Sequence, residues 1–313
     1  MSSTKTLTLL ATAVLASGLF MSCRPKPVVT PDPVALALSA QVMSLDYEGS
    51  GFWGEKAEIG VFVTESGTKE IIGDNANVRY SADFSTGIIN LTPADNPIIL
   101  PEDGTHIDLA GYYPYSPELT TASGSGYLLH ADLSDQTYLD PDMILLAKVQ
   151  NRSSVLHTAM LTLKPAYAKI KVALRTVTDV KSEDSKIDVS IEGISCEADI
   201  DVLEGRYVSY GPLGSTTMTR PLETAHMYEG IVLPQAVADE AVLKVHIPAG
   251  AHTEEESISL VLKDIITELK ANNQYDITVT VSPTGIEATL VGVSDFFVSD
   301  WKEDFDEING EIE

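Results

Sequence analysis

Cysteine is scarce in this chain of 313 residues, which contains only Cys23 and Cys196. A network of disulfides is therefore excluded as the source of stability, and hydrophobic cores must supply it instead. The hydrophobic content of 44% is sufficient to build such cores. We expect Cys196 to be a small, buried, apolar residue in a strand.

Basic residues are also few. The chain has 20 Lys and Arg against 46 Asp and Glu, which gives a formal net charge of −26. Such a charge repels the phosphates of nucleic acids and provides no electrostatic attraction to anionic lipid. We therefore expect no nucleic-acid partner, and we interpret the charge as a source of solubility for a protein exposed outside the cell.

The motifs of catalysis, nucleotide binding and metal binding are missing. The sequence has no Walker A motif and no G-x-G-x-x-G motif, and none of its six histidines has the H-E-x-x-H spacing. Four aspartates lie close together around a loop, where their oxygens could hold Ca²⁺: Asp132, Asp135, Asp140 and Asp142. Their spacing does not match an EF-hand, so we interpret them as solvated turn residues. We predict no enzymatic activity, no cofactor and no metal. An extracellular hydrolase is a distant alternative that a convergent acidic pair in a deep cleft would favour.

The N-terminal segment has the pattern of a lipoprotein signal peptide. Lys5 precedes an apolar run from Leu7 to Phe20, and the small residue Ser22 stands directly before Cys23. The pattern predicts a signal peptide at 1–22 and a Cys23 that is acylated and attached to a lipid bilayer. Residues 23–33 are rich in proline and predict an extended tether. The alternative is an ordinary secretory signal with Cys23 as an incidental thiol.

The remainder of the chain alternates between apolar and polar residues with a period of two. In Ala168–Thr176, for example, Ile170, Val172 and Leu174 face one way and Lys169 and Lys171 the other. This pattern predicts half-buried antiparallel strands, and no long window shows a helical period. Strands are expected at 34–45, 58–63, 106–113, 143–149, 155–163, 168–176, 187–194, 206–210, 227–233, 243–247, 258–262, 275–281 and 287–293.

These strands predict an all-β protein with a domain boundary near Pro165. Strand runs without intervening helices are typical of sandwiches or barrels. We expect an N-terminal β-sandwich at 34–164, a C-terminal β-sandwich at 165–301 and an acidic tail at 302–313.

Several short motifs occur in the same order as in a known family. They are Phe52–Phe62, the segment Ala110–Pro117 with Tyr113, Pro114 and Tyr115, Ser134–Gln136 followed by Asp142–Ala147, Val232–Gln235 with Pro234, Asn273–Val279, and Val298–Trp301 with Trp301 itself. Together these motifs resemble the fimbrillin family of Bacteroidetes, which forms subunits and anchors of pili. The resemblance implies two tandem transthyretin-like antiparallel β-sandwich domains.

The resemblance also implies assembly with other fimbrial subunits by β-strand addition, in which one subunit donates a strand to a groove of the next. The expected N-terminal strand carries Val34, Leu36, Leu38 and Val42. The expected donor region carries Ile286, Leu290, Phe296 and Val298. The alternative is that both segments are ordinary strands of closed domains.

Family members that polymerise are processed after an arginine that follows the first strand. The segment 46–57 contains no arginine, and Lys56 is its only basic residue. This favours an uncleaved subunit that keeps its lipid, such as an anchor, although a cut at Lys56 would restore a stalk role. The expected location is the cell outer membrane or cell surface, in a fimbrium.

A glycan-binding outer-membrane lipoprotein is the alternative function. Such a protein needs exposed aromatic side chains on which sugar rings can stack. The available tyrosines are Tyr112, Tyr113, Tyr115, Tyr207 and Tyr210. Three of them in one exposed patch would favour this alternative.

Overall fold

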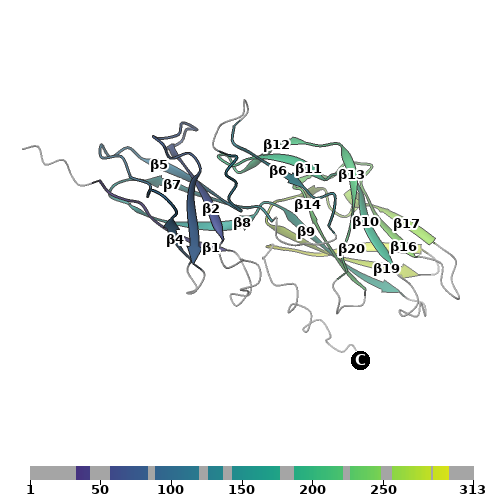
Figure 1. Ribbon diagram of the computed structural model, residues 1–313. Helices are drawn as coiled ribbons and strands as arrows, with labels where there is room; N and C mark the ends of the chain where they lie inside the picture. The colour runs from purple at the N-terminus through teal and green to yellow at the C-terminus, as the bar shows by residue number, and fades with distance from the viewer. Residues whose placement is uncertain are drawn as a thin grey trace, which may run out of the picture. The chain divides into compact units, whose positions relative to one another are not determined.

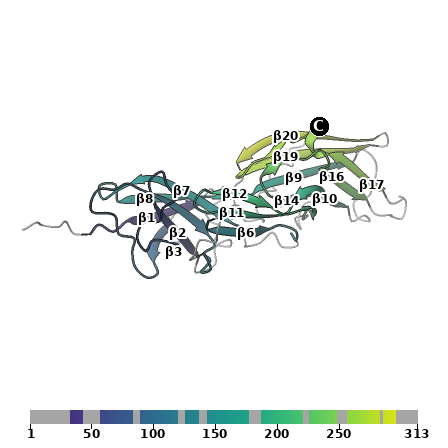
Figure 2. The same ribbon diagram turned by 90° about the horizontal axis from the view of Figure 1, so that it is seen from above.

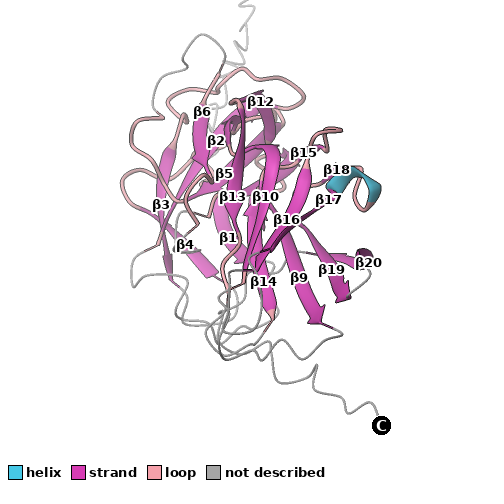
Figure 3. Cartoon of the chain, turned by 90° about the vertical axis from the view of Figure 1, so that its right-hand side faces the viewer, coloured by secondary structure: helices cyan, strands magenta, loops and turns pink. Residues whose placement is uncertain are grey.

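The computed structural model describes residues 33–42, 57–83, 89–119, 126–136, 143–176, 187–220, 226–247, 256–282 and 285–295, all within one compact unit that begins at Pro33. These ranges are built from β-strands, apart from a three-residue 3-10 turn at Leu262–Asp264 (Figure 3). Within them, no helix has the length and apolar character that crossing a membrane requires. The all-β prediction is therefore confirmed.

The first group of strands closes into a barrel. Its order is β1-β4-β3-β2-β5-β7-β8. The bounds are β1 Ala37–Val42, β2 Glu58–Glu65, β3 Val78–Asp83, β4 Ile89–Pro93, β5 Ile107–Tyr113, β7 Leu145–Arg152 and β8 Thr158–Pro165. The sequence predicts a sandwich here. The described strands form a closed barrel instead, because β1 pairs with both β4 and β8 and leaves no edge between them.

The barrel core receives buried side chains from each of these strands. β1 contributes Leu38, for example, and β8 contributes Leu161. The core continues beyond the barrel through Ile200 and Ile231. A smaller cluster lies on the opposite face of β2 and β5, where Phe62 and Tyr112 are fully buried. β2 is therefore buried on both faces.

The second group of strands forms a sandwich of two four-stranded sheets. One sheet has the order β14-β9-β19-β20 and the other β13-β10-β16-β17. The bounds are β9 Ala168–Thr176, β10 Asp188–Ser195, β13 Leu213–Thr217, β14 Met227–Val232, β16 Val242–Ile247, β17 Glu256–Val261, β19 Asn273–Ser282 and β20 Gly285–Asp295. Both sheets bury alternate residues in one core, such as Ile170 from β9 and Val245 from β16. Figure 2 shows β9, β19 and β20 running next to one another.

A third sheet joins segments that are far apart in the sequence. It has the order β12-β11-β6, with β6 at Leu128–Asp132, β11 at Glu197–Asp201 and β12 at Arg206–Tyr210. Two-residue strands also pair, β15 at Gln235–Ala236 with β18 at Glu268–Leu269. The expected domain boundary falls between β8, which ends at Pro165, and β9, which begins at Ala168. β6 precedes this boundary in the sequence and pairs with β11, which follows it. The domain boundary near Pro165 stays a prediction.

Each expected strand overlaps an observed one, but short strands are missing from the expectation. These are β3, β4, β6, β11, β13, β15 and β18. β13, for instance, has the sequence Leu-Gly-Ser-Thr-Thr and is mostly exposed, so it has little apolar alternation. Such strands form because neighbouring strands offer hydrogen-bonding edges, which a local pattern does not reveal.

Buried charges accompany the pairing of β9 with β14. The Glu229 side chain is fully buried, and its carboxylate oxygens lie 2.9 Å from Lys169 Nζ and 3.3 Å from Lys171 Nζ. A buried carboxylate requires such partners, because an unpaired charge in this environment is strongly destabilising. The three residues therefore favour one register of β9 on β14.

Gln136 links the loop after β6 to β14. Its side-chain amide donates to Ile231 O, and its Oε1 accepts from Ile231 N at 2.9 Å. Gln136 is only 6% exposed, so water does not readily replace these bonds. This residue lies in one of the motifs that carry the family resemblance.

We predict that Gln136→Ala lowers the free energy of unfolding by about 1–3 kcal/mol, because it leaves the buried amide and carbonyl of Ile231 without partners. Chemical denaturation measured by circular dichroism checks this value. The matched control is Gln150→Ala, which alters an exposed glutamine. Equal stability of the two variants would contradict the structural role of Gln136.

Candidate functional site

The first candidate site is the position of β1 in the barrel, between β4 and β8 (Figure 1). β1 runs parallel to β8 through six residue pairs, from Ala37–Thr158 to Val42–Leu163. It runs antiparallel to β4, with Ser39 opposite Asn90 and Ala40 opposite Ile89. Just before the strand, the amide of Leu36 donates to Ile98 O at 2.9 Å. Both edges of the segment are thus occupied.

The side chains of this segment alternate as the sequence predicts. Leu36, Leu38 and Ala40 are buried in the barrel core, and Val34 and Val42 pack against the same core while partly buried. The segment therefore fills an apolar slot and also pairs with the edges of both β4 and β8. Each fully buried leucine contributes about 1.5–3 kcal/mol of hydrophobic free energy. This strand is bound tightly although it is short.

The second candidate is β20, the edge strand of its sheet, which lies outermost next to β19 in Figure 3. Ile286 and Leu290 belong to β20, where they pair with Val281 and Ile277 of β19. Leu290 is half-buried against the sandwich core, whereas Val291 and Val293 are 68% and 49% exposed. The described β20 is thus already part of a sheet, with one edge open.

Several of the sequence-predicted residues fall outside the described ranges. These are Cys23, Lys56, Phe296, Val298 and Trp301. Their roles stay predictions.

A family model for fimbrillin-like proteins matches residues 46–301. The chain belongs to the fimbrillin-like family. This family has an adhesive and structural character and is not an enzyme family. No curated sequence matches the chain.

Solved structures share the fold of this chain. A proposed cell adhesion protein from Bacteroides uniformis is 22% identical with a TM-score of 0.65, over 85% of this chain and 98% of that one. A proposed cell adhesion protein from Bacteroides ovatus is 16% identical with a TM-score of 0.62, over 86% and 99%. The tip fimbrial protein Mfa3 from Porphyromonas gingivalis is 12% identical with a TM-score of 0.51, over 83% and 99%.

The tyrosine motif of this fimbrillin-like protein serves the core. Tyr112 is fully buried, and its hydroxyl donates to Asn77 Oδ1 at 2.7 Å. Burial raises the pKa of Tyr112 to about 12. A Cβ atom at Gly60 would lie 2.0 Å from Cε1 of the Tyr112 ring, so this position requires glycine. The glycine of one family motif thus makes room for the tyrosine of another.

The neighbouring motif residues are also structural. Tyr113 is 8% exposed, and the peptide bond between Tyr113 and Pro114 is cis. Arg79 lies over the ring of half-buried Tyr115, 5.9 Å from its centroid. Tyr112 and Tyr113 are buried and Tyr115 is half-buried, so these three of the five tyrosines considered for sugar binding do not form an exposed patch.

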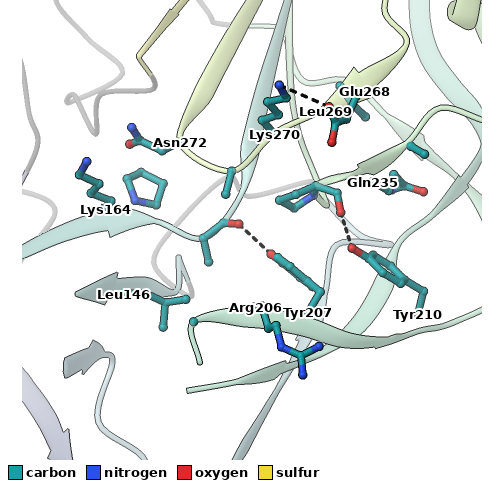
Figure 4. Close-up of a pocket in the computed structure, with 16 residues that line it drawn as sticks. Leu146, Lys164, Arg206, Tyr207, Tyr210, Gln235, Glu268, Leu269, Lys270 and Asn272 are labelled. Carbon is teal, nitrogen blue, oxygen red and sulfur yellow. Dashed lines mark hydrogen bonds and ion pairs between the residues drawn. The ribbon is translucent and has the colours of Figure 1, made fainter. Parts of the chain in front are cut away.

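Tyr207 and Tyr210 do come together. Their rings are stacked, with centroids 5.7 Å apart and an interplanar angle of 15°. They line a cleft with Lys164, Gln235 and Asn272, among others (Figure 4). The sequence indicates the two tyrosines and places Gln235 in a family motif, but it gives no signal for Lys164 or Asn272.

The structure describes two members of the aspartate group, Asp132 and Asp135. Asp132 Oδ1 accepts from the amide of Ser134 at 2.9 Å, and this bonding to Ser134 lowers the pKa of Asp132. Asp140 and Asp142 lie outside the described residues. Within the part of the chain that the structure describes, no group of three His, Cys, Asp or Glu residues is placed to hold a metal.

We predict that Leu38→Ala lowers the free energy of unfolding by about 2–5 kcal/mol, because it creates a cavity in the barrel core. Denaturant titration measures the free energy of unfolding of this variant and of its control. The control is Ala37→Ser, on the exposed side of the same strand. Surface substitutions usually change the free energy of unfolding by less than about 0.5 kcal/mol. A change that small for Leu38→Ala would show that β1 does not occupy the slot.

Proposed function

We propose that this chain is a structural subunit or lipid-retained anchor of a cell-surface fimbria and acts in cell adhesion by donor-strand assembly. The observation that carries the proposal is the position of β1, paired on both edges and buried along one face. Membership of the fimbrillin-like family supports it, as do neighbours named as cell adhesion and tip fimbrial proteins.

Strand addition follows from the physics of this slot. Removal of β1 would expose the hydrogen-bonding edges of β4 and β8 together with the apolar surface that Leu36 and Leu38 cover. Unpaired strand edges beside apolar surface readily bind another strand. A strand from a neighbouring subunit would satisfy both the edges and the apolar trench.

The donor in this proposal comes from the C-terminal region that begins with β20. Ile286 and Leu290 pair with β19 in the described state, so their donation requires β20 to leave its sheet. Among the described strands β20 pairs with β19 alone, so its departure breaks one described pairing. Phe296 and Val298 extend the proposed donor beyond the described residues.

Retention as an anchor is the favoured role within this proposal. The absence of arginine at 46–57 disfavours cleavage after β1, and Cys23 would hold the chain on the outer membrane. Cleavage at Lys56 would instead produce a stalk subunit. The C-terminal sandwich would be transthyretin-like, and the two domains would divide near Pro165.

We predict that cutting the chain between β1 and β2 allows strand exchange. A specific protease site is placed at 46–52, the full chain is cut, and a fluorescent peptide of residues 285–298 is added in excess. The peptide should displace the N-terminal fragment, because it can pair with β4 and β8 and fill the same apolar slot. Native mass spectrometry and gels without boiling report the exchange.

Two peptides serve as controls. A peptide of residues 33–43 should rebind the slot, since it copies β1. The 285–298 peptide carrying Leu290→Asp should bind far less, because it places a charge in an apolar site. Rebinding of 33–43 without any binding of 285–298 would reject this donor, and failure of both peptides would reject strand exchange at this slot.

We predict that Cys23→Ala releases the protein from the membrane fraction, because no acyl chain is then attached. Fractionation of expressing cells and labelling with palmitate measure this. The matched control is Cys196→Ala, which removes the buried cysteine and should leave membrane retention unchanged. Retention and labelling of the Cys23 variant at the wild-type level would contradict anchoring at Cys23.

A further inference from the structure

An open cleft of about 720 Å³ lies where several sequence-distant segments meet. β8 and the residue after it contribute Lys164 and Ala166, and β12 contributes Tyr207 and Tyr210. The turn after β18 contributes Asn272. Its volume falls in the range that small-molecule sites occupy, about 300–1,000 Å³.

A β-bulge places the two tyrosines on the same side of β12. Tyr210 pairs with Ala198 and Tyr207 pairs with Ile200 on β11, so three steps along β12 match two steps along β11. In a regular strand, residues three apart face opposite sides. The extra residue at this bulge therefore turns both rings to one side, and bulges are often found beside functional sites for this reason.

Both rings are held in fixed orientations by their hydroxyl groups. Tyr207 donates to Ala166 O at 2.8 Å, and Tyr210 donates to the carbonyl of Pro234 (Figure 4). Burial raises the pKa of both hydroxyls. Tyr210 nevertheless remains 46% exposed and offers aromatic surface to the cleft. The aromatic platform is thus preorganised.

The charge of the cleft is opposite to that of the chain. Its lining has three basic residues, Lys164, Arg206 and Lys270, and one acidic residue, Glu268, in a chain of net charge −26. Glu268 pairs with Lys270 at 3.4 Å, and Arg206 pairs with Glu204. No ion-pair partner of exposed Lys164 is found among the described residues. Lys164 is therefore available to an anionic ligand.

The wall of the cleft contains an unsatisfied acceptor that is closed to solvent. Asn272 Oδ1 is buried and has no hydrogen-bond partner among the described residues. Buried acceptors of this kind are rare and call for a donor. Figure 4 shows Asn272 and Lys164 on one side of the cleft and the two tyrosines on another. A ligand spanning the cleft meets an aromatic face and a cation.

We propose that this cleft binds a saccharide that carries a carboxylate, such as a uronic or sialic acid unit. The C–H face of the sugar ring stacks on Tyr210, since aromatic faces are electron-rich and apolar. The carboxylate pairs with Lys164, because a charged hydrogen bond is stronger than a neutral one. No bond is made or broken, so the site is a binding site alone.

This inference rests on the proposed adhesive function for its biological use, since it supplies the class of ligand to which a fimbrial protein would attach. The binding itself requires neither strand addition nor acylation. Normal strand exchange without saccharide binding would reject only this inference. Saccharide binding without strand exchange would reject only the assembly mechanism.

Calorimetry and saturation-transfer NMR with the purified chain test the proposal. The probes are trigalacturonate, its neutral methyl ester, 3′-sialyllactose, lactose and a peptide of residues 24–33. We expect saturable binding of trigalacturonate or sialyllactose, which distinguishes the uronic from the sialic source. The methyl ester or lactose should bind at least fivefold more weakly.

Variants locate the ligand. Tyr210→Ala should weaken binding about tenfold or more, in keeping with the energy of stacking contacts, while Tyr210→Phe should retain most of the affinity. Lys164→Gln should remove the preference for the acidic form over its neutral counterpart. Lys263→Gln, a paired lysine outside the cleft, should have no effect. Circular dichroism of each variant establishes that it is folded.

Three outcomes would overturn the proposal. They are absence of binding by both acidic saccharides at millimolar concentration, equal binding of acidic and neutral forms by the wild-type chain, and unchanged affinity in a folded Tyr210→Ala variant. Binding of the proline-rich peptide in place of the saccharides would assign the cleft to peptide recognition instead.

Discussion

The pairing of β1 with two strands at once is the constraint on which the barrel depends. β4 and β8 are far apart in the sequence. β1 joins them because it pairs with β4 along one of its edges and with β8 along the other. Its buried residues fill the core on the same side. A strand in this position stabilises the fold through both its backbone and its side chains. For the same reason, a different strand of suitable pattern can replace it, which is the physical basis of the proposed assembly.

Long-range pairings then connect the barrel to the sandwich strands. β6 precedes β7 and β8 in sequence, yet it pairs with β11. Gln136 follows β6 and bonds to the backbone of β14, and the barrel core itself extends to Ile231 of β14. The contact of Gln136 with Ile231, for example, joins residues 95 positions apart and exists only in the folded state. The family motif around Gln136 is thereby explained by a backbone contact and not by chemistry at a site.

The cleft shows how a small local feature creates a binding surface. One extra residue in β12 brings Tyr207 and Tyr210 to the same side. The ends of β8 and β18 then place Lys164 and Asn272 around them. The alternation of β12 alone would assign the tyrosines to opposite faces. For this reason the sequence indicates tyrosines for sugar binding without revealing that Tyr207 and Tyr210 form a pair. The core buries Tyr112 and Tyr113.

The sequence by itself determined the all-β class, the positions of the longer strands and the family. Side chains alternate with a period of two along any half-buried strand, so this information is local. Composition also set the acidic charge and the lack of disulfide stabilisation. Only the tertiary structure decided which strands are neighbours, that the first group closes into a barrel, and that β12 contains a bulge. Alternation states which face a residue occupies and not which strand lies beside it, because pairing depends on edges supplied by distant segments.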